Sequence, residues 1–118
     1  MIFEALPLEP EEFGVTLTSG ELSILNNCLN EVVNGFTVQG LEEKIGVASH
    51  DEAATLLRVI NKACNSGKHR LLLKRIDLHT LAKIVHLTVV EVEREFAIRT
   101  GFSAKEAEEV ASALQNYL

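Results

Sequence analysis

Four polar side chains between residues 27 and 34 have the types and spacing of a recognition surface. Asn27, Asn30, Glu31 and Asn34 recur at intervals of three and four residues, so a helix would place them on one face. Carboxamides both donate and accept hydrogen bonds, which suits this face to pairing with a partner's backbone. Alternatively, the amides bond a neighbouring loop and help to end the helix, because asparagine competes with helical hydrogen bonding.

A run of basic residues between positions 62 and 75 is the second group, and it contains no acidic residue. Its members that we expect at an interaction surface are Lys68, Arg70, Lys74 and Arg75. Residues 1–61 hold ten acidic and two basic residues, whereas residues 62–118 hold seven acidic and nine basic residues. A basic segment beside an acidic half is suited to docking, although a solvated connector would have the same composition.

The sequence carries no pattern typical of catalysis, metal binding or cofactor binding. Its four histidines and two cysteines are His50, His69, His79, His86, Cys28 and Cys64. They form no His-x-x-x-His or Cys-x-x-Cys pair of the kind that holds zinc, and no glycine-rich phosphate loop occurs. We therefore expect no metal, no cofactor and no enzyme. A small enzyme whose groups converge only in space is the third-ranked alternative.

The segment 78–98 resembles the helix-turn-helix of DNA-binding proteins. Ala82 takes the small position of the first helix, His86 the turn position and Val92 the buried position of the second helix. The second helix also carries three glutamates, whose charge opposes binding to phosphates. We therefore expect a segment used for packing, with nucleic acid not an expected partner. A nucleic-acid-binding regulator is the second-ranked function.

The elements that position these groups follow from the spacing of apolar residues and from helix caps. In the first half we predict a strand over 15–18, a helix over 20–34, a short helix over 41–45 and a helix over 50–65. In the second half we predict a strand over 70–74, a helix capped by Asp77, a helix over 88–100 and a last helix opened by Ser103, with Glu106 completing a capping box. Ser19 and Ser49 are the predicted N-caps of the first half. Residues 1–13 contain both prolines and are predicted to form an irregular arm.

The two halves share this order of elements. A shift of 56 positions aligns the strand at 15–18 with Leu71–Lys74, and a shift of 54 aligns Ser49 with Ser103. We therefore predict a mainly α (α+β) fold in a single domain over 1–118, with an arm over 1–13 and two pseudo-repeated strand-helix-helix-helix units, 14–67 and 68–118. The two short strands would pair antiparallel, with their outer edges open to a second copy of the chain.

The run Glu21–Gly35, together with 41–47 and 49–53, resembles a group of short, uncharacterised bacterial proteins. These carry a Leu-x-x-Leu-Asn-Asn-x-Leu-Asn-Glu-Val helix, then a glycine and a Gly-Val-Ser helix start. The resemblance covers residues 14–62. It implies a shared structural unit and no particular activity.

Composition places the chain among globular proteins, with 47% hydrophobic and 24% charged residues. The first residues lack a signal peptide, and no apolar run approaches the 18 residues of a membrane span. We therefore expect a cytoplasmic protein with reduced thiols. Its expected function is a non-enzymatic protein-interaction or regulatory module, whose partner is another protein or a second copy in a homodimer.

Overall fold

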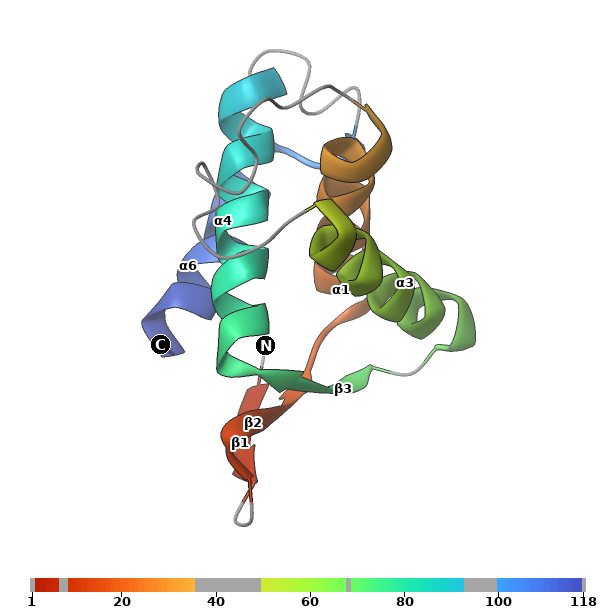
Figure 1. Cartoon of the computed structure of the whole chain (residues 1–118). Helices are drawn as coiled ribbons and strands as arrows, with labels where there is room; N and C mark the ends of the chain where they lie inside the picture. Colours follow the sequence, from red (N-terminus) through yellow and green to blue (C-terminus); the bar gives the residue numbers. More distant parts are fainter. Residues whose placement is uncertain (1, 7–8, 36–49, 68, 93–99, 118) are drawn as a thin grey trace.

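Helices make up most of the chain in the computed structural model, which describes residues 2–6, 9–35, 50–67, 69–92 and 100–117. Its elements are β1 (Ile2–Leu6), β2 (Glu9–Thr16), α1 (Ser19–Asn30), the π-helical turn η1 (Glu31–Gly35), α3 (His50–Ser66), β3 (Arg70–Lys74), α4 (Arg75–Val92) and α6 (Ala104–Tyr117). The helices lie on one side of a small sheet that closes one end of the molecule (Figure 1). The prediction of a mainly helical fold with antiparallel strands is confirmed.

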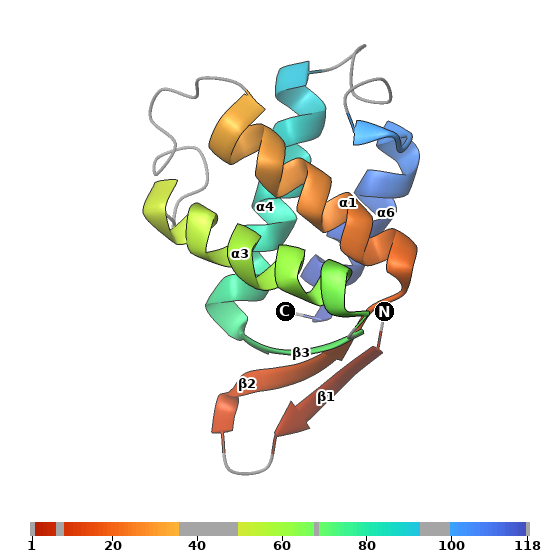
Figure 2. The same ribbon diagram turned by 90° about the vertical axis from the view of Figure 1, so that its right-hand side faces the viewer.

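The sheet has three strands in the order β1-β2-β3, and both pairings are antiparallel. The predicted strand over 70–74 is present and lies against β2, with Val15 opposite Leu71 and Phe13 opposite Leu73. Figure 2 shows β3 on the side of the sheet nearest the helices, with β1 at the other edge. β3 is therefore an edge strand that continues directly into α4.

The prediction of an irregular arm over 1–13 is wrong, because this segment forms β1 and most of β2. The ladder between these strands pairs Ala5 with Phe13 and then Leu6 with Glu9, so three residues of β2 bulge out. Pro10 lies in that bulge, where no ladder hydrogen bond is required from it. A proline that appeared to exclude a strand is thus accommodated by a bulge.

Capping boxes begin two of the helices. The cap of α1 is Thr18 rather than the predicted Ser19: the Thr18 hydroxyl accepts from the Glu21 N–H at 3.1 Å, and Glu21 Oε1 accepts from the Thr18 N–H at 2.8 Å. The predicted box at the last helix is confirmed, since Ser103 Oγ accepts from the Glu106 N–H at 3.1 Å. Glu106 Oε1 in turn accepts from the Ser103 N–H at 3.2 Å.

α4 is one continuous helix, so the helix-turn-helix predicted over 78–98 is wrong within the described residues up to Val92. His86, at the predicted turn, lies inside the helix and is exposed. The buried stripe passes this point without a break: Ile84 and Val85 precede it and Thr88 follows it. Continuing the helix buries Thr88, whose hydroxyl donates to the Ile84 carbonyl at 2.8 Å. A left-handed turn at a histidine would carry a conformational penalty.

Asp77 is not the N-cap that the sequence predicted, because α4 begins two residues earlier, at Arg75. Its Oδ2 accepts from the Lys74 N–H at 2.9 Å, so Asp77 lies in the first turn of α4 and reaches back to the residue that precedes the helix. Asp77 thereby fixes the junction between β3 and α4.

α1 occupies the centre of an aliphatic core. Leu22, Leu25, Cys28 and Leu29 of α1 are at most 2% exposed. They join buried residues of α3, α4 and α6 in one cluster that also reaches the sheet at Val15. Such burial is the main favourable term in folding.

The second helix of each predicted repeat falls largely outside the described residues, as do Ser49 and Lys68. α3 (His50–Ser66) agrees with the helix predicted over 50–65. Among the described helices, none combines the length and the apolar composition needed to span a membrane.

Replacing His86 by glycine or by alanine tests the continuity of α4. We expect His86→Gly to unfold with a free energy about 1 kcal/mol lower than His86→Ala, because glycine has the lower helix propensity. Both variants lose the 3.2 Å contact between His86 Nδ1 and Glu108 Oε1, so that contact cancels in the comparison. Urea unfolding followed by circular dichroism gives the difference. A more stable glycine variant would instead indicate a left-handed turn at this position.

Candidate protein-interaction site

The four residues predicted to form one recognition face are divided between two environments. Asn27 Nδ2 donates to the Thr100 carbonyl at 2.7 Å, and Glu31 is only 8% exposed within η1. Asn30 and Asn34 are exposed, and Asn34 Nδ2 donates to Asn30 Oδ1 at 3.0 Å. Asn27 therefore holds together parts of the protein, as the alternative interpretation of these amides expects.

A chain of amides extends from Asn27 to the far end of α3. Asn65 Nδ2 donates to Asn61 Oδ1 at 3.0 Å, and Asn61 Nδ2 donates to Asn26 Oδ1 at 3.2 Å. Asn26 Nδ2 lies 3.5 Å from Asn27 Oδ1, which completes a path from α3 through α1 to Thr100. The unusual number of asparagines in α1 thus has a structural role that joins three segments distant in sequence.

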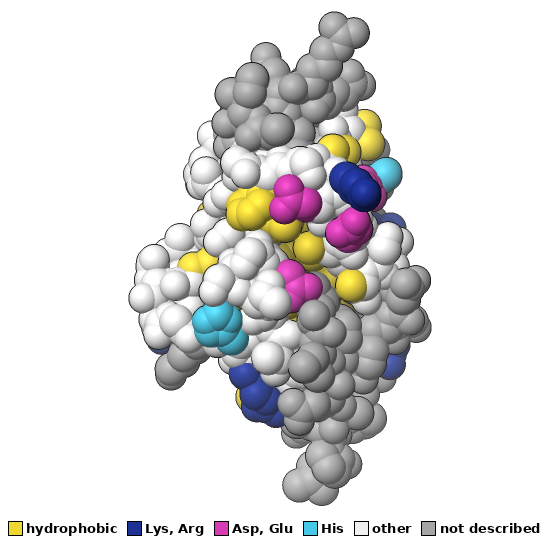
Figure 3. Space-filling view, turned by 180° about the vertical axis from the view of Figure 1, so that it is seen from behind, with side chains coloured by type: hydrophobic (Ala, Val, Ile, Leu, Met, Phe, Trp, Pro, Cys, Tyr) yellow, Lys and Arg dark blue, Asp and Glu magenta, His cyan; other side chains and the backbone are white. Residues whose placement is uncertain are grey.

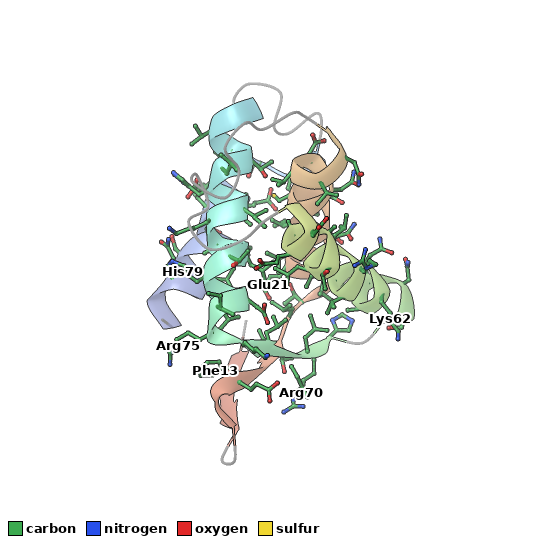
Figure 4. All side chains as sticks on the ribbon, viewed as in Figure 1. Phe13, Glu21, Lys62, Arg70, Arg75 and His79 are labelled. Carbon is green, nitrogen blue, oxygen red and sulfur yellow. The ribbon has the colours of Figure 1, made fainter. Side chains whose placement is uncertain are left out.

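The predicted basic surface is also spread out. The Arg70 guanidinium lies across Gly14, where a Cβ would meet it too closely, and Arg75 stacks 5.2 Å from the centre of the Phe13 ring. Lys74 is exposed, and Lys68 lies outside the described residues. Figure 4 shows Arg70 and Arg75 at separate places, so these two guanidinium groups do not lie together.

Cys28 is unsuited to act as a nucleophile. Burial raises the pKa of its thiol from 9.0 to about 12; the Thr88 side-chain hydrogen bond opposes this shift and the nearby Glu31 charge adds to it. The nucleophilic form of cysteine is the thiolate, which is scarce at neutral pH when the pKa is so high. Among the described residues, no three His, Cys, Asp or Glu side chains gather as a metal site requires.

A groove of about 270 Å³ lies between α3 and the junction of β3 with α4. We call it the α3–β3 groove. Its α3 wall consists of Glu52, Thr55, Leu56 and Val59. Its other wall consists of Leu72 and Leu73 of β3 and of Ile76, Asp77 and Thr80 of α4. The groove therefore has an apolar interior with two carboxylates and two hydroxyls.

The large hydrophobic side chains that the described part of the protein leaves exposed are concentrated in this groove. Leu72 is 57% exposed, Ile76 49% and Val59 40%, and all three line it; the fourth, Val90, is 49% exposed and lies elsewhere on α4. Exposed apolar side chains that gather at one place typically mark a binding site.

The backbone of β3 also contributes to this site. The Leu17 N–H donates to the His69 carbonyl at 2.8 Å, so His69 belongs to a hydrogen-bonded pair of the β2–β3 ladder. Because such pairs alternate along antiparallel strands, Leu71 and Leu73 bond to β2, and the N–H and C=O of Leu72 face the outer edge. Within the described part of the chain, neither group of Leu72 has a hydrogen-bond partner.

Sequence reasoning did not identify Val59, Leu72 or Ile76 as site residues. One signal was present: three consecutive leucines occur at 71–73, whereas successive side chains of a strand point to opposite faces. Only one face of β3 packs on the core, so the middle leucine is turned away from it. The contribution of α3 depends on tertiary packing and left no local signal.

A second hollow, of about 250 Å³, lies between the first turns of α1 and α6. Figure 3 shows acidic side chains around hydrophobic ones on this face, and the hollow is lined by Glu21, Glu106 and Glu109 around Ile24, Phe102 and Val110. Glu21 and Glu106 are the capping residues of the two helices. Their placement is explained by helix capping. None of the large hydrophobic side chains that the described part of the protein leaves exposed lines this hollow, so the α3–β3 groove is the stronger candidate.

The two kinds of asparagine are distinguished by paired substitutions. We expect Asn27→Ala to lower the free energy of unfolding by about 1 kcal/mol relative to Asn30→Ala, because only Asn27 bonds a partly buried carbonyl. Both changes gain the helix propensity of alanine, so Asn30→Ala is the matched control. Chemical denaturation of both variants gives the difference, and equal stabilities would contradict a structural role for Asn27.

Comparison of the chain with protein-family models, with curated protein sequences and with solved structures gave no match. The site is therefore interpreted from its own geometry.

Proposed function

We propose that the chain is a non-enzymatic protein-interaction module that binds its partner in the α3–β3 groove. The observation that carries this proposal is the gathering of Val59, Leu72 and Ile76, exposed from three different elements, beside the outward backbone groups of Leu72. An apolar groove next to an unpaired strand edge offers a polypeptide both side-chain contacts and main-chain hydrogen bonds. A folded domain that keeps such a surface exposed incurs an aggregation risk unless a partner uses it.

A different protein fits this groove better than a second copy of the chain does. Antiparallel pairing of two β3 strands about Leu72 would place Arg70 of one copy opposite Lys74 of the other. Like charges in directly opposed positions destabilise a sheet. In the homodimer alternative, the copies would instead meet along the outer edge of β1, the other edge of the sheet.

We also propose that the two halves arose by duplication. Val15 lies opposite Leu71, the residue that the 56-position shift assigns to it, which suits a pseudo-twofold axis through this pair. β2 and β3 each lead into a long helix, α1 and α4. The first half has an additional strand, β1, on the other side of β2, and the described part of the second half has no counterpart to it, so β3 ends at a sheet edge.

Partner capture with two matched variants tests the groove. Ile76 and Val90 are both 49% exposed on α4, but only Ile76 lines the groove. We expect a protein retained by immobilised wild-type chain from native lysate to be retained equally by Val90→Ser. Ile76→Ser should weaken its binding about tenfold, the scale of one central apolar contact at an interface.

Binding would be measured with the purified partner by calorimetry, after circular dichroism has shown both variants to be folded. A partner that depends on Val90 and not on Ile76, or on neither, would contradict the proposed site.

A further inference from the structure

We infer that the occupant of the α3–β3 groove is an extended segment of the partner that adds to β3 as a further strand, with apolar side chains at alternate positions facing the groove and with lysine or arginine at a further groove-facing position. This inference rests on the proposed function and specifies the chemistry of the partner. It follows from the backbone, the apolar surface and the charge of the groove, in that order.

The backbone of β3 favours an extended ligand. Leu72 presents one N–H and one C=O outward, which an added strand pairs with and which a bound helix cannot, because a helix uses its own backbone groups internally. A helix over this edge would bury both groups without partners, and each would lose the free energy of its bond to water. Toward the end of β3, the Lys74 N–H is already bonded to Asp77, so the added strand is short and centred on Leu72.

The apolar surface sets the periodicity of the ligand. In a strand, residues i and i+2 point to the same face, so only alternate side chains of the segment face the groove. Val59, Leu72 and Ile76 surround the place where those side chains would lie. Two apolar residues separated by one residue are therefore the expected core of the recognised segment.

The charge of the groove indicates which charged residues the ligand should carry. Glu52 and Asp77 line it, no basic residue in the described part of the chain does, and Asp51 is exposed beside Glu52 in the first turn of α3. These carboxylates repel an acidic segment and favour lysine or arginine at the groove-facing position beyond the apolar pair. A cation there is not directly opposite Arg70 or Lys74, which lie on either side of Leu72 in β3. The same charge disfavours nucleic acid at this site, since its phosphates would face carboxylates.

Selection from a random dodecapeptide display library tests this chemistry. The selections run in parallel on wild-type protein, Ile76→Ser and Val90→Ser. We expect the wild type and Val90→Ser to enrich the same peptides, with apolar residues at i and i+2 and a basic residue at i−2 or i+4, on the same face. Ile76→Ser should not enrich them. Peptides that depend on Ile76 but show helical i, i+3, i+4 spacing or acidic residues would overturn the extended, basic ligand and leave the interaction site intact. No enrichment, or enrichment independent of Ile76, would overturn both the proposed ligand and the proposed interaction site.

Backbone methylation of the best enriched peptide tests strand addition directly. Methyl groups are placed one at a time on successive backbone nitrogens, and binding is followed by fluorescence anisotropy. Methylation of the nitrogen that pairs with Leu72 should weaken binding about tenfold, with little effect at its two neighbours, because N–H groups of a strand alternate in direction. Uniform sensitivity along the peptide would overturn the strand geometry.

The charge argument has its own variant pair. Glu52→Gln should weaken binding of the basic peptide and reduce its dependence on salt, since a removed charge no longer attracts the ligand. Glu109→Gln, in the other hollow, is the control and should leave both unchanged. Equal effects of the two substitutions would show a general charge effect and overturn the assigned role of Glu52.

Discussion

The antiparallel ladder between β2 and β3 is the interaction on which the rest of the structure depends. It joins residues 12–16 to residues 70–74, and each strand leads into a helix that packs in the core. At its end, Leu17 and His69 form a main-chain bond of 2.8 Å, and His69 Nδ1 lies 2.9 Å from the Leu17 carbonyl. Pairing such distant residues costs chain entropy, because it closes a long loop. Burial of the hydrophobic core must offset this cost for the ladder to form.

Local signals in the sequence were sufficient for several elements. α3, the strand at 70–74 and the Ser103–Glu106 capping box were predicted because a cap or an apolar stripe is encoded within a few neighbouring residues. The exposed Asn30 and Asn34 pair is likewise a local i, i+4 contact. Where residues that are close in sequence are also close in space, the local sequence pattern is sufficient to predict the element.

The features that sequence reasoning missed are those that depend on long-range packing. Pro10 is compatible with β2 only because β1 leaves room for a bulge, and α4 continues through His86 because Thr88 is buried against α1. The groove combines Val59 with Leu72, whose elements meet only through the tertiary fold. The partner of Asn27 is a carbonyl 73 positions away, which no local pattern of asparagines could reveal.

β3 and α4 share a boundary without a linker, because Lys74 ends the strand and Arg75 begins the helix. The hydrogen bond from the Lys74 N–H to Asp77 Oδ2 crosses this boundary and holds the two elements together at the bend. α4 has 18 residues, so it is about 27 Å long, and a tilt of about ten degrees at β3 would displace its far end by about 5 Å. That far half carries His86 against Glu108 of α6. A partner that tilts β3 on binding at the sheet edge would therefore also shift the opposite end of α4.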